Sequence, residues 1–291
     1  EQHRFGVAQR LALKNKGADV HQLMMSATPI PRTLAMSFFA DLDVSVIDEL
    51  PPGRTPIKTR LVNSVRRSEV EGLVLGACRK GQQAYWVCPL IEESETLQLQ
   101  TATETQAALQ AALPELSIGL VHGRMKAAEK AEVMAEFSAG RLNVLVATTV
   151  IEVGVDVPNA ALMVIEHAER MGLAQLHQLR GRVGRGAAAS ACVLLFAEPL
   201  GDIAKARLKV IYEHTDGFEI ARQDLNIRGP GEFLGARQSG VPMLRFANLE
   251  EDLPLLEAAR NLAPQLIKER QDIEKAHLAR WLASRESYLG V

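Results

Sequence analysis

The fold is decided by residues Ser117–Thr149, which read SIGLVHGRMKAAEKAEVMAEFSAGRLNVLVATT. Ser117–Val121 and Asn143–Thr148 are short and almost entirely apolar, as expected of strands buried on both faces. Lys126–Phe137 lies between them and is predicted to be a helix. Parallel strands need a crossover of about this length, which is usually helical. The stretch therefore predicts an α/β fold with a mainly parallel sheet.

The same alternation continues on both sides of this unit. Further strands are predicted at Ile57–Val62, Gln83–Pro89, Ala161–Ile165 and Ala191–Phe196. Helices are predicted at Arg67–Arg79, Ala102–Leu113 and Gln175–Arg185, with a polar loop before the second of these. Near the end of the chain only helices are expected, at Asp202–His214, Phe218–Asp224, Leu253–Glu269 and Lys275–Ser284. This order indicates a parallel sheet covered by helices on both faces, followed by a helical region.

Two breaks in the pattern suggest how the chain is divided. Pro51-Pro52-Gly53 interrupts the sequence before the first strand of the alternating region, and strands stop after Pro199. We therefore expect three parts, namely residues 1–50, 51–198 and 199–291. The chain opens on Glu1 without an initiator methionine, which suggests a piece of a longer protein.

Composition limits the possible function. The 291 residues carry a formal net charge of −2, so a nucleic-acid site would have to be a local patch. Cys78, Cys88 and Cys192 lack CxxC spacing, which predicts buried free thiols in a reduced, cytoplasmic protein without a disulfide or zinc framework. No signal peptide and no apolar run long enough to span a bilayer is evident, so we expect no membrane association.

Residues Gln175–Gly186 read QLHQLRGRVGRG and form the most distinctive polar stretch. In a continuous helix, Gln175, Gln178, Arg182 and Arg185 would share one face, and Leu176, Leu179 and Val183 would form an apolar stripe on a different face. Arginines left unpaired on one face suit phosphate oxygens, above all the charge that develops in phosphoryl transfer. An exposed basic helix that only aids solubility is the alternative. The alternating glycines argue against it, because a solvated face does not need them.

Other candidate groups follow the predicted strands, where ligands of parallel sheets gather. Thr148 and Thr149, followed by Gly154 and Asp156, would suit a phosphate and a ribose hydroxyl, although a structural turn explains them equally well. His122 has no second metal ligand nearby, so no metal site is predicted. Two other carboxylates, Glu166 and Glu169, could imitate a catalytic pair, but a solvated strand end is the better interpretation. The sequence holds no G-x-x-x-x-G-K-[ST] loop, so it can supply only half of a nucleotide site.

Taken in order, these segments resemble the second half of a superfamily 2 helicase motor. Glu1-Gln2-His3 resembles the end of a D-E-x-H box, and Ser26-Ala27-Thr28 resembles the S-A-T coupling motif. His122–Met125, Thr148–Asp156 and Gln178–Arg185 resemble three later motifs, the last being the arginine-finger motif Q-x-x-G-R-x-G-R. The glycine-rich stretch Asn226–Gly240, with the residues just before it, resembles the translocation motif shared by the RecG family and the transcription-repair coupling factor.

The resemblance covers essentially the whole chain and is closer to the RecG family. It implies that residues 1–50 end a first RecA-like lobe, that 51–198 form a second RecA-like lobe, and that 199–291 form a helical region with the translocation motif. It further implies an ATP-dependent DNA helicase that remodels stalled forks and Holliday junctions in recombination and repair. Its partners would be branched DNA and the rest of its own chain. ATP and Mg²⁺ would be bound mainly by the first lobe, so the piece alone should be inactive.

The resemblance also assigns roles to single residues. The catalytic group would comprise Glu1, Arg182 and Arg185, and the nucleotide-binding group Gln178, Gly154 and Asp156. The DNA backbone would be contacted by His122, Gly123, Arg124, Thr148 and Thr149. Coupling between nucleotide and DNA would involve His3, Ser26, Thr28, Arg228 and Gln238.

Three alternatives remain open at this point. The chain could come from a transcription-repair coupling type of double-stranded DNA translocase. It could be a non-catalytic DNA-binding module that kept the fold. The helical tail could also be a plain oligomerisation element.

Overall fold

The computed structural model describes residues 16–17, 21, 23, 25, 45, 47, 49, 56–89, 95–148, 157–186, 189–228 and 252–282. Eight of the predicted site residues lie outside these ranges: Glu1, His3, Ser26, Thr28, Thr149, Gly154, Asp156 and Gln238. The chain divides into two compact units, one of Val44–Pro230 and one that joins Glu1–Asp43 to Gly231–Val291.

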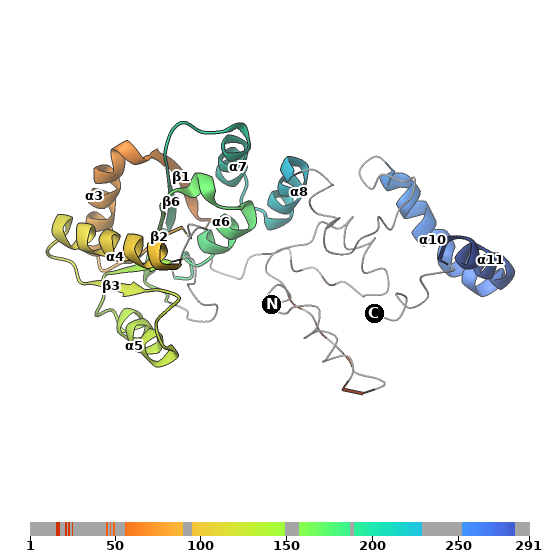
Figure 1. Ribbon diagram of the computed structural model, residues 1–291, viewed down its shortest axis with the longest axis horizontal. Helices are drawn as coiled ribbons and strands as arrows, with labels where there is room; N and C mark the ends of the chain where they lie inside the picture. Colours follow the sequence, from red (N-terminus) through yellow and green to blue (C-terminus); the bar gives the residue numbers. More distant parts are fainter. Residues whose placement is uncertain are drawn as a thin grey trace. The chain divides into compact units, whose positions relative to one another are not determined.

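The first of these units is built on a six-stranded sheet in the order β1-β6-β5-β2-β4-β3 (Figure 1). The strands are β1 Lys58–Asn63, β2 Gln83–Cys88, β3 Ile118–Val121, β4 Val144–Thr148, β5 Ala160–Ile165 and β6 Ala191–Phe196. Every pair of neighbours runs parallel. The predicted strands are confirmed, each to within one residue at either end. The predicted α/β class with a parallel sheet is confirmed as well.

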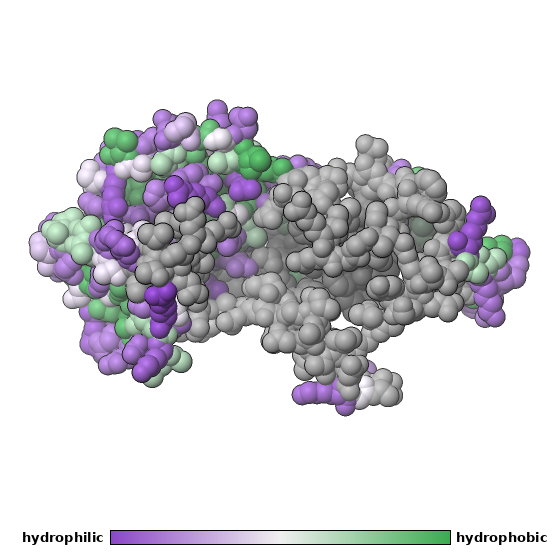
Figure 2. All heavy atoms as spheres, in the orientation of Figure 1, coloured by the Kyte–Doolittle hydropathy of each residue, from purple (hydrophilic) through white to green (hydrophobic). Residues whose placement is uncertain are grey.

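Helices cover both faces of the sheet. On one face lie η2 Ser64–Arg66, α3 Arg67–Cys78 and α4 Glu95–Ala112. On the other lie α5 Ala127–Ser138, η3 Ala168–Arg170, α6 Leu173–Arg180, α7 Asp202–Glu213 and α8 Gly217–Arg228. Alternate side chains of a strand point to opposite faces of the sheet. Trp86 therefore packs in the core cluster beneath α3 and α4, whereas Tyr85 packs in the core cluster beneath α5 to α8. In the face drawn in Figure 2, hydrophilic residues predominate over the described part of this unit, with hydrophobic ones in small groups.

Two helices of this unit are longer than the sequence suggested. Helix α4 begins at Glu95, within the stretch predicted as a polar loop. The side-chain hydrogen bond from Gln100 Nε2 to Glu104 Oε1 (2.8 Å) supports its first turns, as pairs four residues apart do in helices. Helix α8 continues to Arg228, so the first residues of the predicted glycine-rich loop are helical.

Helices α7 and α8 pack with the sheet, because Leu208, Ile211 and Ile220 are buried in the same core cluster as Tyr85. The compact unit consequently runs to Pro230, beyond the expected end of the second lobe at residue 198. The assignment of the three parts to helicase lobes stays a prediction.

The described part of the second unit consists mainly of two helices, α10 Leu253–Glu269 and α11 Gln271–Leu282 (Figure 1). The bounds of α10 are those predicted, and α11 begins four residues earlier than Lys275. Within the ranges that the structure describes, no helix has the length and apolar character needed to cross a membrane.

Candidate functional site

His122 and Thr148 lie next to each other at the carboxyl edge of the sheet. Strands β3 and β4 are paired in parallel with Val121 opposite Ala147, which places the following residues, His122 and Thr148, side by side. Thr148 is buried. His122 is half-buried, and its buried Nδ1 atom has no hydrogen-bond partner among the residues that the structure describes. Burial, and then the nearby Lys130 ammonium, lowers the pKa of His122, which favours the neutral imidazole.

The turn after His122 is exposed and surrounded by basic groups. Met125 N donates a hydrogen bond to His122 O (3.3 Å), and this contact closes the turn. Lys130 Nζ in α5 donates to Gly123 O at 3.1 Å. A Cβ atom added at Gly123 would meet no atom of the described residues within 4 Å, so these residues leave the space beside its backbone open. An exposed turn of this kind, with Arg124 beside it and a helix N-terminus following, suits a phosphate group.

The predicted continuous helix from Gln175 to Arg185 is wrong. Helix α6 ends at Arg180, and Gly181 forms its C-cap. Gly184 has a φ of +78°, a left-handed conformation that an α-helix does not contain. Gln178 therefore lies half-buried on the helix, whereas Arg182 and Arg185 lie on the turn that follows it. We call residues 181–186 the arginine turn.

The arginine turn is held firmly against the sheet. Val183 is buried, as are Leu176 and Leu179, so the predicted apolar stripe is confirmed. Both arginines of the turn have interaction partners in the structure, so the expectation of an unpaired arginine face is wrong. Arg185 is nevertheless exposed, and Arg182 is half-buried.

Two of the three glycines of the arginine turn, Gly184 and Gly186, allow it to pack closely against the rest of the protein. A Cβ atom at Gly184 would lie 2.9 Å from Cγ1 of Ile57, and one at Gly186 would collide with the carbonyl oxygen of Pro158. Ile57 directly precedes β1, and Pro158 lies two residues before β5. The arginine turn is thus at the amino edge of the sheet, opposite the edge that carries His122 and Thr148.

Sequence reasoning missed Arg180, the last residue of α6. Its side chain is buried and its guanidinium is surrounded by five acceptors. Nη1 donates to the carbonyl oxygens of Ile211 (2.8 Å) and His214 (2.8 Å) and to Thr59 Oγ1 (3.4 Å). Nη2 donates to Thr215 O at 3.3 Å and lies 3.1 Å from His177 Nδ1. Arg180 follows Leu176 by four residues, so a charged residue on the apolar stripe was the signal that could have revealed it.

The neutral imidazole of His177 accepts one of these hydrogen bonds from Arg180. Burial, followed by the positive charge of Arg180, lowers the pKa of His177 to about 4. Its Nδ1 atom can therefore act as an acceptor for Arg180 Nη2. Burial also lowers the pKa of the Arg180 guanidinium from its usual value.

The expected solvated strand end at Glu166 is also wrong. This carboxylate is buried directly after β5, and its Oε1 accepts a hydrogen bond from Trp86 Nε1 (2.9 Å). The same oxygen pairs with Arg67 Nη1 at 2.9 Å, and the Arg67 guanidinium lies 5.2 Å from the Trp86 ring centroid. Glu169 Oε2 accepts from Ala197 N (3.3 Å). Glu166 thus links the end of β5 to β2 and α3, and Glu169 links η3 to the residue after β6.

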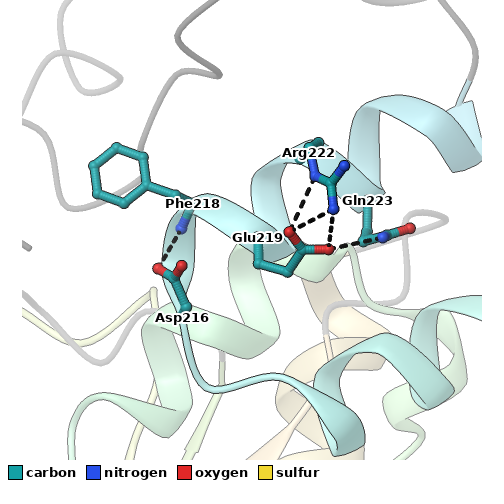
Figure 3. A network of polar contacts seen from close by, with 5 residues as sticks. All are labelled: Asp216, Phe218, Glu219, Arg222 and Gln223. Atoms are coloured by element: carbon teal, nitrogen blue, oxygen red, sulfur yellow. Dashed lines mark hydrogen bonds and ion pairs between the residues drawn. The ribbon is translucent and has the colours of Figure 1, made fainter.

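Arg228 ends helix α8, whose first turn is stabilised by a local polar network (Figure 3). Asp216 Oδ1 accepts a hydrogen bond from Phe218 N at 2.9 Å. Glu219 accepts from Arg222 Nη2 (2.7 Å) and from Gln223 Nε2 (2.8 Å). Helix α8 packs against α6, so the start of the predicted translocation motif is joined to the helix that carries the arginine turn.

The three cysteines lie in the two core clusters of the sheet. Cys78, Cys88 and Cys192 are buried free thiols, as predicted. Burial raises the pKa of Cys78 to about 11 and that of the other two to about 12, which keeps all three protonated at neutral pH. The described residues contain no group of three or more side chains that could hold a metal ion.

Comparisons with known proteins agree with this architecture. Residues 67–187 match the family described as "Helicase conserved C-terminal domain", and residues 214–283 match "ATP-dependent DNA helicase RecG, domain 3, C-terminal". The chain is 59% identical over 288 residues to the ATP-dependent DNA helicase RecG of Acidithiobacillus ferridurans, covering 99% of this chain and 42% of that protein. The corresponding protein of Escherichia coli K12 is 58% identical over 293 residues, with the same two coverages.

A solved structure is similar as well. It is titled "Structure of RecG bound to three-way DNA junction" and matches with a TM-score of 0.67 and 49% identity, over 88% of this chain and 32% of the other. The chain thus spans less than half the length of the relatives that it matches. By sequence and fold together, the chain is similar to RecG proteins over nearly its whole length, and residues 214–283 match a C-terminal domain of that family.

Proposed function

We propose that this chain forms the second motor lobe and the C-terminal part of an ATP-dependent DNA helicase that remodels branched DNA. The observation that carries the proposal is the 49% identity, over 88% of the chain, to a RecG protein whose structure was solved with a three-way DNA junction. The activity belongs to the intact protein, because the chain spans only 42% of its relatives. The match of residues 214–283 to a RecG family model favours this function over a transcription-repair coupling translocase.

In this proposal the arginine turn provides the second half of the ATP site. ATP with Mg²⁺ supplies the phosphoryl group that is transferred to water, and cationic side chains stabilise the charge that develops. Arg182 and Arg185 lie on a turn fixed between Ile57 and Pro158, which suits them to approach the phosphates with little loss of freedom. Gln178 of α6 would assist them, and Gly154 and Asp156 would contact the nucleotide. Mg²⁺ would be held mainly by the first lobe, where Glu1 would activate the water.

The carboxyl edge of the sheet would contact the DNA backbone. Gly123 offers open backbone, Arg124 is exposed beside it, and Lys130 lies close to the same turn. His122, with its pKa lowered, favours the neutral form, so the positive charge at this edge comes from the arginine and lysine side chains. Thr148 and Thr149 would extend the contact at and beyond the carboxyl end of β4. Backbone contacts of this kind position the protein without reading sequence, which suits an enzyme that recognises branched structure.

The remaining predicted residues would couple the two sites. His3, Ser26 and Thr28 would connect the lobes, while Arg228 and Gln238 would connect nucleotide hydrolysis to DNA movement. Of these, only Arg228 lies within the described ranges, at the end of α8.

The test uses the intact protein that contains this chain. DNA-stimulated ATP hydrolysis and ATP-dependent unwinding of a three-way junction and of a Holliday junction are measured, with linear duplex as the control substrate. We expect both activities on branched DNA. Nucleotide-independent DNA binding without hydrolysis would instead establish the non-catalytic alternative and contradict the proposal.

A further inference from the structure

Strand β1 forms one edge of the sheet, and part of its backbone points away from the other strands. Among the described strands it pairs with β6 alone (Figure 1). Lys58 N donates to Ser190 O at 3.0 Å, so the backbone of Lys58 is turned towards β6. In a paired strand, the backbone groups of successive residues point in alternate directions. Thr59 and Leu61 therefore present their N–H and C=O groups to the side of β1 that faces away from β6.

This side of β1 is the floor of a groove between two helices. The groove has a volume of about 810 Å³ and follows residues 57–62, with α3 on one side and the end of α7 on the other. We call it the β1 groove. Each wall carries a large apolar side chain that stays exposed, namely Leu73 of α3 (43%) and Tyr212 of α7 (56%). Exposed apolar groups beside a strand edge are the features of a surface that binds an extended peptide as an additional strand.

The exposed charges on β1 itself are positive. Lys58 and Arg60 are both exposed and are two residues apart, so they lie on the same face of the strand. Val62 continues this face and packs against the core cluster beneath α3 and α4, whereas Leu61 packs against the other core cluster. The two cations therefore lie on the α3 side of the β1 groove, and Leu61 lies on the α7 side.

The acidic groups of the β1 groove do not neutralise these cations. Glu69 pairs with Arg66 at 2.6 Å, and Glu213 lies 4.0 Å from Lys209. Within the ranges that the structure describes, neither of the two cations of β1 forms an ion pair with a carboxylate. Opposite charges on neighbouring strands stabilise their pairing. A strand with acidic side chains on the α3 side would therefore complement β1.

A second copy of β1 is a poor occupant of this groove. Two β1 strands in antiparallel pairing would place Arg60 opposite Arg60, or Lys58 opposite Arg60 in a register shifted by two residues. Like charges directly opposite each other oppose the pairing of strands. The occupant must therefore differ from β1 in sequence.

We propose that the β1 groove is a docking site for an extended, acidic segment of a partner protein. The segment adds to the sheet as a further strand and exchanges backbone hydrogen bonds with Thr59 and Leu61. Its alternate side chains are acidic towards Lys58 and Arg60 and apolar towards Tyr212. This interaction surface lies beyond the helicase function proposed above and does not depend on it.

The test measures peptide binding by the intact protein that contains this chain, using fluorescence polarisation. The probe is a labelled, capped peptide that alternates glutamate and valine over the six residues of β1. A peptide that alternates lysine and valine has the same length and apolar face. We expect saturable binding of the acidic peptide and at least roughly tenfold weaker binding of the basic one. Equal affinities, or no saturable binding of the acidic peptide, would overturn the proposal.

A double charge reversal locates the site. Lys58→Glu combined with Arg60→Glu should weaken binding of the acidic peptide by at least about tenfold and should improve binding of the basic one. Lys268→Glu combined with Arg270→Glu is the matched control, because these cations are exposed and have the same spacing in the other compact unit. The control should stay within about twofold of the parent. An unchanged preference for the acidic peptide after reversal at β1 would contradict the proposal.

A backbone substitution tests whether the peptide binds as a strand. Thr59→Pro removes the outward N–H of Thr59 and leaves the hydrogen bond from Lys58 N to β6 in place. Thr59→Val keeps this N–H and loses only the hydroxyl. We expect at least roughly tenfold weaker binding for the proline variant and a change within about twofold for the valine variant. Equal affinities of the two folded variants would exclude strand addition.

N-methylated peptides provide the same test without changing the protein, and they decide the question if Thr59→Pro does not fold. One peptide is methylated at the valine nitrogens and the other at the glutamate nitrogens. Only one of these two sets of N–H groups can face β1, because the backbone groups of a strand alternate in direction. One methylated peptide should therefore lose binding while the other keeps it. Equal effects of the two methylations would overturn the proposal.

Discussion

Gly184 and Ile57 are so close together that a methyl group on Gly184 would collide with the Ile57 side chain. A Cβ atom at Gly184 would lie 2.9 Å from Cγ1 and 3.3 Å from Cδ1 of Ile57. The φ of +78° at Gly184 adds a backbone conformation that other residues adopt only with strain. The arginine turn therefore keeps its position partly because one residue in it has no side chain.

Gly184→Ala should destabilise the protein and misplace the arginine turn. Left-handed strain costs about 1–2 kcal/mol, and the contact with Ile57 adds to it. Gly140→Ala is the control, since Gly140 has a similar φ of +76° but nothing within 4 Å of the added atom. Denaturant unfolding should show a larger loss for Gly184→Ala, and Ile57→Val should restore part of the difference. Equal losses at the two glycines would show that the Ile57 contact is unimportant.

Arg185→Ala should remove ATP hydrolysis and unwinding while the protein stays folded. An arginine finger contributes about 10³–10⁵ in rate, and Arg185 is exposed, so little packing is lost. Steady-state ATPase assays and thermal unfolding of the intact protein measure the two effects. Arg79→Ala serves as control, because Arg79 is an exposed arginine paired with Glu115 at 2.7 Å. Near-normal unwinding by Arg185→Ala would exclude the finger role.

Arg228→Ala should impair unwinding more than ATP turnover. The prediction follows from the place of Arg228 at the end of α8, within the stretch that resembles a translocation motif. Arg222→Ala provides a control on the same helix, because Arg222 pairs with Glu219 near the surface. Gln238→Ala should behave like Arg228→Ala. If both activities fell by the same factor, the two residues would have no coupling role.

Glu166→Ala should be strongly destabilising. The substitution leaves Trp86 Nε1 without its acceptor and Arg67 without one of its carboxylate partners, at a cost of roughly 2–4 kcal/mol. Glu69→Ala is the control, because both partners of the Glu69–Arg66 ion pair are exposed and such pairs contribute little to stability. Denaturant unfolding followed by tryptophan fluorescence measures both. Similar losses would mean that the buried carboxylate is no more important than a surface one.

Stability should decrease as the pH falls from about 6.5 towards 4, in part because of His177. Its folded-state pKa of about 4 is below the ordinary value of 6.5, so the unfolded chain binds more protons between these limits. The stabilisation is complete above the ordinary pKa and is lost towards the folded pKa, by about 3 kcal/mol. His177→Gln keeps an acceptor for Arg180 and should flatten this part of the profile. A profile of unchanged slope would show that His177 does not titrate as described.

The sequence predicted the sheet well, because strands buried on both faces are continuous apolar runs. Its failures have specific physical causes. Periodicity extended α6 to Arg185 because the apolar stripe continues to Val183, but glycine at 181 and 184 ends the helix first. The spacing of Leu176 and Val183 shows which face of α6 is buried. It cannot show which carbonyl groups of other segments that face contacts.

The roles of Arg180 and Glu166 were missed because spacing in the sequence does not show the tertiary partners of a side chain. Their partners, Ile211 and Trp86, lie 31 and 80 residues away and are brought close only by tertiary packing. The resemblance to helicase motifs identified residues by type and order, whereas these two side chains connect segments between the motifs. The family itself could be predicted because several motifs occur in the expected order.

The arginine turn and His122 lie at opposite ends of the strands, with the length of a strand between them. Five residues of a strand such as β4 span about 17 Å. A parallel sheet covered on both faces does not bend easily, so its two edges move together as parts of one rigid body. Tilting the lobe by about 11° about one edge moves the other by roughly 3.4 Å, the rise of one nucleotide along a strand of DNA. If the proposed function holds, a small closure around ATP would be geometrically sufficient to advance the intact protein by one nucleotide.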